Sequence, residues 1–412
     1  MLWLLVNLPD KNALDKLLDS PKLNGAVVSA TVTDLDGNVL YEKNSGIHVL
    51  PASNQKLFSN AFALWERGAD YRPQTRFWKL SDRIVIDSTG DPLMTFDQLK
   101  HAQSQLGADR HLPVYVREAY APQIPDGWDY DDLPNKYAAP VTAFGFDRNS
   151  FSIWSLGGRA ALLPSSFGVR LSVDRKAGPL VTRYDPFLRE VWVSGTLPKK
   201  DQVLDTLALP HPDEIAAKVF GARLEYTEDL PQREPDLVLT GGSVIDIVRA
   251  CLPPSDNNLA ENLLLLGARK EGELGPNPYP LACKRMKDFL VHVVGISEED
   301  LHPFDGSGLS RRNYLTSRAL AKLLCWANQQ PTSAAWHSAL AKSGTGTLSN
   351  RLKDVRFQGK TGSLAMVSSL SGYVTSLAGK TLIVSIVMNE FGCTADEVHA
   401  IQDEFTRILA RD

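Results

Sequence analysis

The segment from Pro51 to Gly68 constrains the fold of this 412-residue chain more than any other stretch. Between Leu57 and Trp65, apolar side chains recur on more than one face of a helix, and Gly68 suits the position after a helix C-terminus. A helix that is apolar on more than one face must be surrounded by other elements. We therefore predict a helix buried in the core of a domain.

Ser53 and Lys56 stand at the start of this predicted helix, and no other serine in the chain lies three residues before a lysine. In a helix the two side chains share one face, one turn apart. A serine hydroxyl becomes a nucleophile when a base lies within hydrogen-bond reach, and a desolvated lysine amine can serve as that base. The pair favours nucleophilic catalysis; an ordinary helix N-terminus is the alternative.

The composition narrows the class of protein. Hydrophobic residues make up 43% and charged residues 22% of the chain, as in a soluble globular protein, and the length predicts two or three domains. The net charge of -4 gives no sign of a nucleic-acid or membrane-surface partner. No apolar stretch is long enough to span a bilayer. The apolar start, Met1 to Val6, is short and not preceded by Lys or Arg, so it lacks the layout of a full signal peptide. A first strand or helix, or the remnant of a removed export signal, are the interpretations that remain open.

Cysteine and histidine spacing indicates neither a metal site nor a cofactor. The four cysteines form no Cys-x-x-Cys pair, and the eight histidines fit no triad or metal spacing. The chain has no His-Glu-x-x-His, P-loop, Gly-x-Gly-x-x-Gly or Gly-x-Ser-x-Gly motif. We therefore predict no metal and no cofactor, and expect most cysteines to be small buried hydrophobes.

The two ends of the chain predict strands of one antiparallel sheet covered by helices. Residues 26–33 and 39–43 flank a turn signal, as do residues 367–375 and 381–389. A strand is also expected at 357–360. Helices are predicted at 12–20, 244–250, 258–270, 280–294, 316–328 and 395–410.

The middle of the chain has a different texture. From about residue 71 to 235, short segments alternate with prolines, glycines and aspartates, and strands are predicted at 151–155, 168–173 and 190–196. We therefore predict a β-rich insertion at 71–235 within a catalytic domain formed by residues 1–70 and 236–412.

Ser255-Asp256-Asn257 is a second candidate motif, in a loop after two prolines and before a predicted helix. The hydroxyl of Ser255 and the carboxamide of Asn257 could both point toward a substrate. A helix N-cap, which Ser or Asn fills readily, is the alternative.

Lys360-Thr361-Gly362 is a third candidate. A lysine and a hydroxyl at a sheet edge can bind a carboxylate, and a glycine lets a ligand approach the backbone closely. Lys342-Ser343-Gly344 has the same character but leads into a polar loop, whereas Lys360 leads through Ser363 into a predicted hairpin. We therefore assign the motif to Lys360.

These three motifs, in this chain order, are the signature of penicillin-binding proteins and class A β-lactamases. Further segments resemble the peptidase S13 family, the low-molecular-mass class C penicillin-binding proteins with D-alanyl-D-alanine carboxypeptidase and endopeptidase activity. The resemblance covers nearly the whole chain. It is carried by residues 51–56, 90–92, 127–132, 137–140, 147–149, 305–311 and 370–373.

The resemblance implies a multidomain α/β fold. A transpeptidase-like domain, with an antiparallel sheet flanked by helices, would carry inserted β-rich domains between Ser53 and Ser255, which are 202 positions apart. Two nested domains are expected there, at about 71–146 with 200–235 and at 147–199. The gap is on the short side for the family, so one of them could be trimmed.

It also implies the catalytic roles. Ser53 would be acylated by a peptide ending in D-Ala-D-Ala, Lys56 would accept the serine proton, and Ser255 would relay a proton to the leaving amine. Whether the lysine is the direct base is disputed for related enzymes.

The remaining residues would bind the substrate. By resemblance, Asn257 holds the substrate amide, and Lys360 and Thr361, next to Gly362, bind the terminal carboxylate. The backbone N–H groups of Ser53 and Ser363 would form the oxyanion hole.

Asp147 is a further candidate, implied to meet the amino group of the stem-peptide diamino acid. A turn aspartate that caps its own backbone is the alternative. The implied partners are peptidoglycan peptides and, as covalent inhibitors, β-lactam antibiotics. The implied location is outside the cytoplasmic membrane, in the periplasm or at the cell wall.

Two other functions fit the same motifs. One is a β-lactamase or esterase on this scaffold, which would release an acyl group from Ser53 rapidly. The other is a catalytically silent protein that binds the cell wall. Inactive relatives usually lose a nucleophile or base, and here none is missing.

Overall fold

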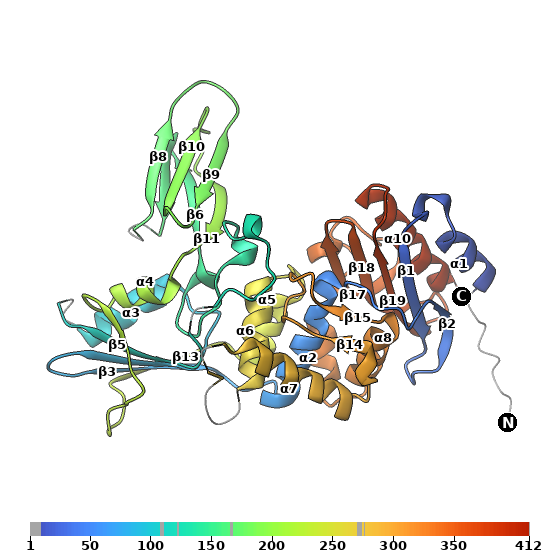
Figure 1. Cartoon of the computed structure of the whole chain (residues 1–412), viewed down its shortest axis with the longest axis horizontal. Helices are drawn as coiled ribbons and strands as arrows, with labels where there is room; N and C mark the ends of the chain where they lie inside the picture. Colours follow the sequence, from blue (N-terminus) through green and yellow to red (C-terminus); the bar gives the residue numbers. More distant parts are fainter. Residues whose placement is uncertain are drawn as a thin grey trace. The chain divides into compact units, whose positions relative to one another are not determined.

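The computed structural model describes residues 10–107, 111–121, 123–164, 168–269, 274–275 and 277–411. The apolar segment from Met1 to Val6 lies outside the described residues. The chain forms two compact units: the first contains residues 1–70, 244–268 and 279–412, and the second contains residues 71–243 and 269–278. In Figure 1 the chain colours show that the first unit joins the blue start of the chain to its orange and red end.

A six-stranded sheet forms the centre of the first unit, and all its strand pairs are antiparallel. Because β1 pairs with β19, the first strands of the chain share this sheet with the last ones, as predicted. The strand order is β16 (Ala341–Lys342), β17 (Arg356–Leu364), β18 (Val367–Thr375), β19 (Thr381–Asn389), β1 (Val27–Thr33) and β2 (Val39–Lys43).

Helices cover the sheet on both faces. α1 (Lys11–Leu18) and α10 (Ala395–Arg411) pack together, and α10 lies against β18 and β19. Their apolar stripes close one hydrophobic core, in which Leu14 and Phe405 are fully buried. α8 (Ser317–Asn328) contacts β1, β18 and β19 but lies outside that core, so it covers the opposite face.

α2 (Gln55–Arg67) is the buried helix predicted from its apolar run. Ten of its thirteen residues are buried, and Gly68 ends it with a φ of 79° and an N–H that donates to the Leu64 carbonyl. α5 (Val244–Cys251), α6 (Asn257–Ala268) and α7 (Tyr279–His292) surround it. The first unit also contains a short hairpin, β14 (Leu301–His302) with β15 (Tyr314–Leu315). Its shorter helices include η1 (Pro21–Leu23), η2 (Ala52–Asn54), η6 (Glu298–Asp300), α9 (Ser333–Ala339) and η7 (Gly346–Leu348).

The second unit is richer in strands. One mixed five-stranded sheet has the order β12 (Leu224–Tyr226), β5 (Val114–Glu118), β4 (Ile84–Ser88), β3 (Gln74–Lys79) and β13 (Leu237–Thr240). One three-stranded sheet has the order β8 (Arg170–Asp174), β10 (Glu190–Ser194) and β9 (Val181–Asp185). Another three-stranded sheet has the order β11 (Gln202–Ala208), β6 (Ser150–Leu156) and β7 (Arg159–Leu163). The helices are α3 (Phe96–Leu106), α4 (Pro212–Lys218) and the short η3 (Tyr130–Asp132), η4 (Lys136–Ala138) and η5 (Asp147–Asn149). The predicted multidomain α/β class is confirmed.

The far boundary of the insertion lies later than predicted. We expected residue 236 to begin the catalytic domain again, but β13 pairs with β3, so the chain returns to the first unit at Val244. There the Ile245 N–H donates to the Ala69 carbonyl at 3.1 Å. Residues 269–278 also belong to the second unit. The two nested domains remain a prediction, because 71–243 form one compact unit with 269–278.

Among the helices of the described residues, none combines enough length with enough apolar character to cross a bilayer.

Candidate active site

Ser53 and Lys56 lie together at the start of the buried helix. Ser53 belongs to η2, whose first residue, Ala52, has a φ of 46°, and Lys56 follows in the first turn of α2. Lys56 Nζ is 2.9 Å from Ser53 Oγ. Ser53 keeps part of its surface exposed, whereas Lys56 is fully buried. The predicted pair is therefore a hydroxyl in contact with a desolvated amine.

Lys56 has two further partners, and both can only accept hydrogen bonds. Its Nζ donates to Asn257 Oδ1 at 2.6 Å and to the Ser307 carbonyl at 2.7 Å. Burial lowers the pKa of Lys56, against smaller opposing effects from Cys251, Asp305, Glu261 and Asp256. When the amine is neutral, its two N–H bonds point to these carbonyl oxygens and its lone pair faces Ser53 Oγ.

A buried carboxylate, which the sequence motifs do not reveal, fixes the loop that supplies the Ser307 carbonyl. Both oxygens of Glu261 accept backbone N–H groups, from Gly306 and from Ser307, at 2.8 Å each. Burial, and next the negative charge of Asp305, raise the pKa of Glu261 to about 8. Asp305 itself closes the loop by accepting from the Gly308 and Ser310 N–H groups. Glu261 therefore acts on Lys56 indirectly, by fixing the loop whose Ser307 carbonyl accepts a hydrogen bond from Lys56.

Lys360 and Ser255 form a second lysine–serine contact. Lys360 Nζ donates to Ser255 Oγ at 2.7 Å and to the Thr361 carbonyl at 2.8 Å. Lys360 is fully buried, and burial together with the charge of Lys56 lowers its pKa well below the usual value. Ser255 has a φ of 64°, and the neighbouring Asp256 accepts from the Leu259 N–H at the start of α6. Asp256 therefore caps the N-terminus of α6, and the Ser255 hydroxyl accepts a hydrogen bond from Lys360 instead of capping the helix.

The edge of β17 lies against the nucleophile turn. A Cβ atom on Gly362 would be 2.8 Å from the Ser53 backbone nitrogen and 2.3 Å from Ser369 Oγ, so the strand can approach this closely only with glycine. Ser363, the next residue, is exposed. Thr361 Oγ1 donates to Thr347 Oγ1 at 2.7 Å, and Thr347 is a second residue that the motifs did not reveal.

Two other predicted positions lie elsewhere. Lys342, the lysine to which the substrate-binding motif was not assigned, is exposed on β16. Asp147 lies in the second unit, in η5, where three successive residues have positive φ. Burial raises the pKa of Asp147, and a hydrogen bond from the Phe96 backbone N–H at the start of α3 opposes the shift. That contact is with another segment, not with its own turn.

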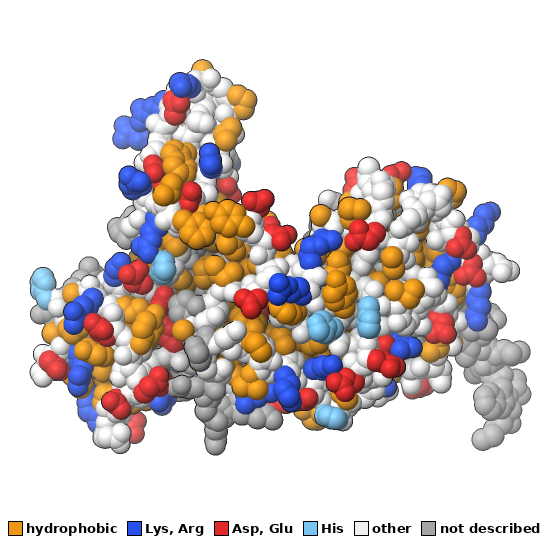
Figure 2. All heavy atoms as spheres, viewed as in Figure 1, with side chains coloured by type: hydrophobic (Ala, Val, Ile, Leu, Met, Phe, Trp, Pro, Cys, Tyr) orange, Lys and Arg blue, Asp and Glu red, His pale blue; other side chains and the backbone are white. Residues whose placement is uncertain are grey.

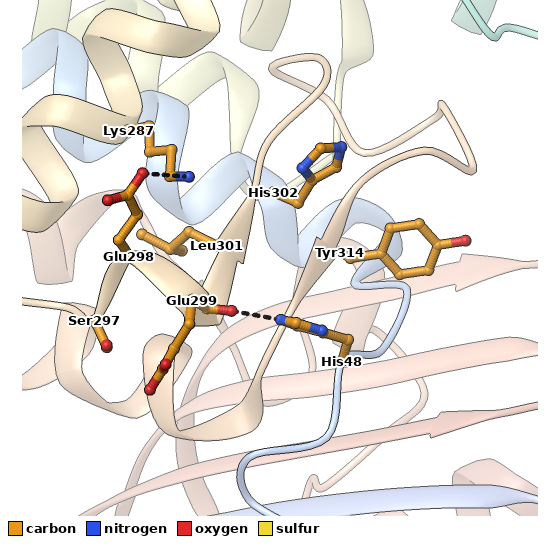
Figure 3. Close-up of a pocket in the computed structure, with 8 residues that line it drawn as sticks. All are labelled: His48, Lys287, Ser297, Glu298, Glu299, Leu301, His302 and Tyr314. Carbon is orange, nitrogen blue, oxygen red and sulfur yellow. Dashed lines mark hydrogen bonds and ion pairs between the residues drawn. The ribbon is translucent and has the colours of Figure 1, made fainter.

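An open pocket of about 820 Å³ lies on another part of the first unit, around the β14–β15 hairpin (Figure 3). His302 and Tyr314 project from its paired strands, and His48 Nε2 donates to the Glu299 carbonyl at 2.6 Å. The site residues described above do not line it, so its size says nothing about the Ser53 chemistry. Among the described residues, no cluster of His, Cys, Asp and Glu could hold a metal ion.

Known proteins resemble this chain over almost its full length. The model of the D-Ala-D-Ala carboxypeptidase 3 (S13) family matches residues 10–162 and 172–412. A D-alanyl-D-alanine carboxypeptidase from Actinomadura sp. (strain R39) is 26% identical, over 96% of this chain and 84% of the relative. Carboxypeptidase DacB from Mycolicibacterium smegmatis is 25% identical, over 93% of this chain and 80% of the relative.

Solved structures share the fold. Penicillin-binding protein 4 from Haemophilus influenzae has a TM-score of 0.76 at 19% identity, over 96% of this chain and 98% of that chain. The predatory peptidoglycan endopeptidase Bd3459 from Bdellovibrio bacteriovorus has a TM-score of 0.54 at 12% identity, over 92% and 90%. The predicted membership is confirmed by the family match: the chain belongs to the D-Ala-D-Ala carboxypeptidase 3 (S13) family.

Proposed function

We propose that the protein is a serine-type D-Ala-D-Ala carboxypeptidase that acts on peptidoglycan stem peptides through an acyl-enzyme on Ser53. The observation that carries the proposal is the 2.9 Å contact between Ser53 Oγ and a fully buried Lys56 whose other two partners only accept hydrogen bonds. Family membership and the carboxypeptidase relatives support the same activity.

Acylation begins with proton transfer from Ser53 to Lys56. The lowered pKa of Lys56 favours the neutral amine, whose lone pair faces the hydroxyl. Ser53 Oγ then attacks the carbonyl carbon between the two D-alanines. The backbone N–H groups of Ser53 and Ser363 stabilise the negative charge on the carbonyl oxygen, and removal of one such donor typically costs ~2.7–4 kcal/mol of barrier.

Collapse of the intermediate breaks the C–N bond, and the leaving nitrogen needs a proton. Ser255 supplies it: Lys360 donates to Ser255 Oγ, so the hydroxyl proton of Ser255 points away from Lys360 and toward the substrate. D-Alanine leaves, the remaining acyl group stays on Ser53, and the proton that Lys56 took from Ser53 is passed on to Ser255, so that Lys56 is neutral again. Water then attacks the ester and gives one proton to Lys56. As the ester C–O bond breaks, Lys56 returns this proton to Ser53 Oγ, and the shortened peptide leaves as a carboxylic acid.

Substrate binding uses the residues around these two contacts. Lys360 and Thr361 bind the terminal carboxylate, with Thr347 holding the Thr361 hydroxyl. Asn257, whose Oδ1 already accepts from Lys56, orients its carboxamide toward the substrate amide. Asp147 remains a proposed contact for the amino group of the stem-peptide diamino acid, and an additional endopeptidase activity remains a prediction.

Two consequences of this function concern inhibitors and location. A β-lactam resembles the D-Ala-D-Ala terminus, so it would acylate Ser53 and remain attached; among the structural neighbours, the Haemophilus influenzae protein has been solved with a β-lactam. Because peptidoglycan lies outside the cytoplasmic membrane, the protein would act there.

The experiment measures two reactions on one preparation. Native protein and the Ser53→Ala variant are treated with a fluorescent penicillin, and D-alanine release is followed on an N-acylated peptide ending in D-Ala-D-Ala. We expect labelling and release from the native protein and neither from Ser53→Ala. The same two reactions are measured on Lys360→Ala, for which Lys342→Ala is the matched lysine control.

The outcomes separate the alternatives. Labelling that disappears within seconds through hydrolysis would identify a β-lactamase. Absence of both labelling and release in folded native protein would leave the silent cell-wall binding protein.

A further inference from the structure

A pocket of about 500 Å³ lies within the second unit, in a part of the chain that the proposed reaction does not use. Its wall is formed by residues from the 123–140 segment, by Pro186, Phe187 and Arg189 of the β9–β10 turn, and by residues from 208–211 at the end of β11. Its volume is within the range of ligand sites, and its wall combines apolar side chains with Arg189, His211 and Gln123.

Two exposed aromatic rings stand at this pocket. Phe187 lines it and stacks on Tyr130 of η3, with ring centroids 5.6 Å apart and planes only 7° from parallel. Each side chain is 67% exposed. Figure 2 shows hydrophobic side chains gathered on this face of the second unit, around the place of β6 and β11. A contiguous exposed apolar patch of this kind marks an interaction site.

The pocket also presents a guanidinium. Arg189 lies 3.6 Å from Glu214 Oε2, an ion-pair distance too long for a hydrogen bond, and this buried oxygen has no hydrogen-bond partner among the described residues. The contact holds the charge in place while the five N–H donors of the side chain can bind a ligand.

Two polar residues of the pocket have an unusual backbone conformation. Arg189 and His211 both have a φ of 50°, a conformation that costs a non-glycine residue on the order of 1–3 kcal/mol and persists only where the surrounding structure imposes it. Both side chains line the pocket. The surrounding structure therefore fixes the backbone from which these two side chains enter the pocket.

We propose that this pocket binds the N-acetylhexosamine rings of the peptidoglycan glycan strand. A pyranose ring has a face of C–H groups that packs on an aromatic ring, and its acetamido and hydroxyl oxygens accept hydrogen bonds from a guanidinium. The aromatic pair and Arg189 offer both kinds of contact. The inference rests on the proposed function, which makes peptidoglycan the substrate: Ser53 receives the peptide, and the second unit holds the sugar.

The test uses the full chain and a sugar probe without peptide. Isothermal titration calorimetry measures binding of a tetramer of β-1,4-linked N-acetylglucosamine to native protein and to Phe187→Ala, Tyr130→Ala and Arg189→Asn. Asn tolerates the positive φ at position 189. Leu188→Ala is the matched control, since Leu188 is 60% exposed in the same turn but lies outside the pocket wall and the aromatic pair. Circular dichroism confirms that each variant folds.

We expect saturable binding to native protein, a loss of about tenfold or more in affinity for Phe187→Ala and Arg189→Asn, and a change below about twofold for Leu188→Ala. Absence of binding at about 10 mM tetramer overturns the proposal, since the affinity would then be weaker than millimolar. Equal effects of Phe187→Ala and Leu188→Ala also overturn it, as does displacement of the tetramer by a sugar-free stem pentapeptide.

Penicillin labelling of the same samples separates this proposal from the proposed function. Labelled native protein that binds no tetramer contradicts the sugar pocket alone. Native protein that binds tetramer but is not labelled contradicts the Ser53 chemistry alone. Unchanged labelling of Phe187→Ala with weakened sugar binding supports both.

Discussion

Lys56 and Lys360 are both fully buried, each in contact with a different serine hydroxyl, and burial, and next the charge of Lys56, lower the pKa of Lys360. Two amines that share a desolvated site cannot both remain protonated as easily as in water. Their proximity favours at least one neutral amine at a pH where free lysine is charged.

The first prediction concerns pH. Burial lowers the pKa of Lys56, so its neutral form accumulates below the usual lysine value, and protonation as the pH falls removes the base. We expect the rate of Ser53 acylation by penicillin to rise with pH along a limb centred below about 10.4, the value of free lysine. Stopped-flow labelling across pH measures it; a rate that is flat over that range excludes Lys56 as the base.

The second prediction separates the two lysine candidates. Lys360→Ala removes the hydrogen-bond donor to Ser255 and a proposed hydrogen-bond donor to the substrate carboxylate. We expect kcat/KM for D-alanine release to fall roughly 10- to 100-fold, as for the loss of a hydrogen bond to a charged group. Lys342→Ala, at an exposed lysine on β16, should stay within about twofold of native. Comparable losses in both variants would argue against the assignment.

The third prediction concerns Glu261. In Glu261→Gln an amide NH₂ replaces one oxygen and cannot accept a backbone N–H from Gly306 or Ser307, so we expect a loss of about 1–3 kcal/mol in the free energy of unfolding. Slower acylation should accompany it, since the Ser307 carbonyl would no longer be fixed against Lys56.

The pKa of Glu261 gives this variant a pH signature. The folded-state pKa is raised to about 8, so the unfolded state releases its proton first, and the contribution of Glu261 to stability is full below the unfolded pKa and lost as pH rises through about 8. The stability gap between native and Glu261→Gln should therefore narrow from about pH 4.3, the value of a free glutamate, to about pH 8 and stay constant above it in urea titrations. A gap that widens with pH contradicts this sign. Glu298→Gln, at an exposed glutamate, is the control.

The fourth prediction tests the close approach of β17 to the nucleophile turn. In Gly362→Ala the new Cβ atom meets Ser369 Oγ and two backbone atoms, Pro51 O and Ser53 N, at 2.8 Å or less. Such overpacking typically costs ~1–3 kcal/mol and would displace the Ser53 N–H from the oxyanion position. We expect lower thermal stability and weaker penicillin labelling. Gly392→Ala, where a Cβ atom meets nothing within 4 Å, should match native in both measurements.

Local spacing predicted part of the site well. A three-residue separation within one helical turn suffices to bring Ser53 and Lys56 together, and an apolar run on several faces suffices to bury their helix. The contact between Lys360 and Ser255 joins residues far apart in the chain, and only the resemblance to a family led to it. Strand periodicity likewise predicted the central hairpins, but the turn-rich texture of the middle region concealed α3 and α4.

Two residues that support the candidate site, Glu261 and Thr347, were not predicted from the sequence. Glu261 lies four residues after Asn257, in a helix whose other central residues are Leu, Ala and Asn, and every residue of that helix is buried. A charged residue in such a helix must be paired, so it could have been singled out. Thr347 had no such signal. It lies in the segment after the rejected Lys342 motif, and its partner, Thr361, lies on the strand β17, so nothing local in the sequence connects the two.

The hydrogen bond from Ile245 to Ala69 means that the long excursion of the chain begins and ends at neighbouring backbone positions. The strands of the host sheet all lie outside residues 71–243, so a change in the length of this insertion leaves the register of the sheet unaltered. The close contact between Ser53 and Lys56, which also lies outside the insertion, is then independent of the insertion's size.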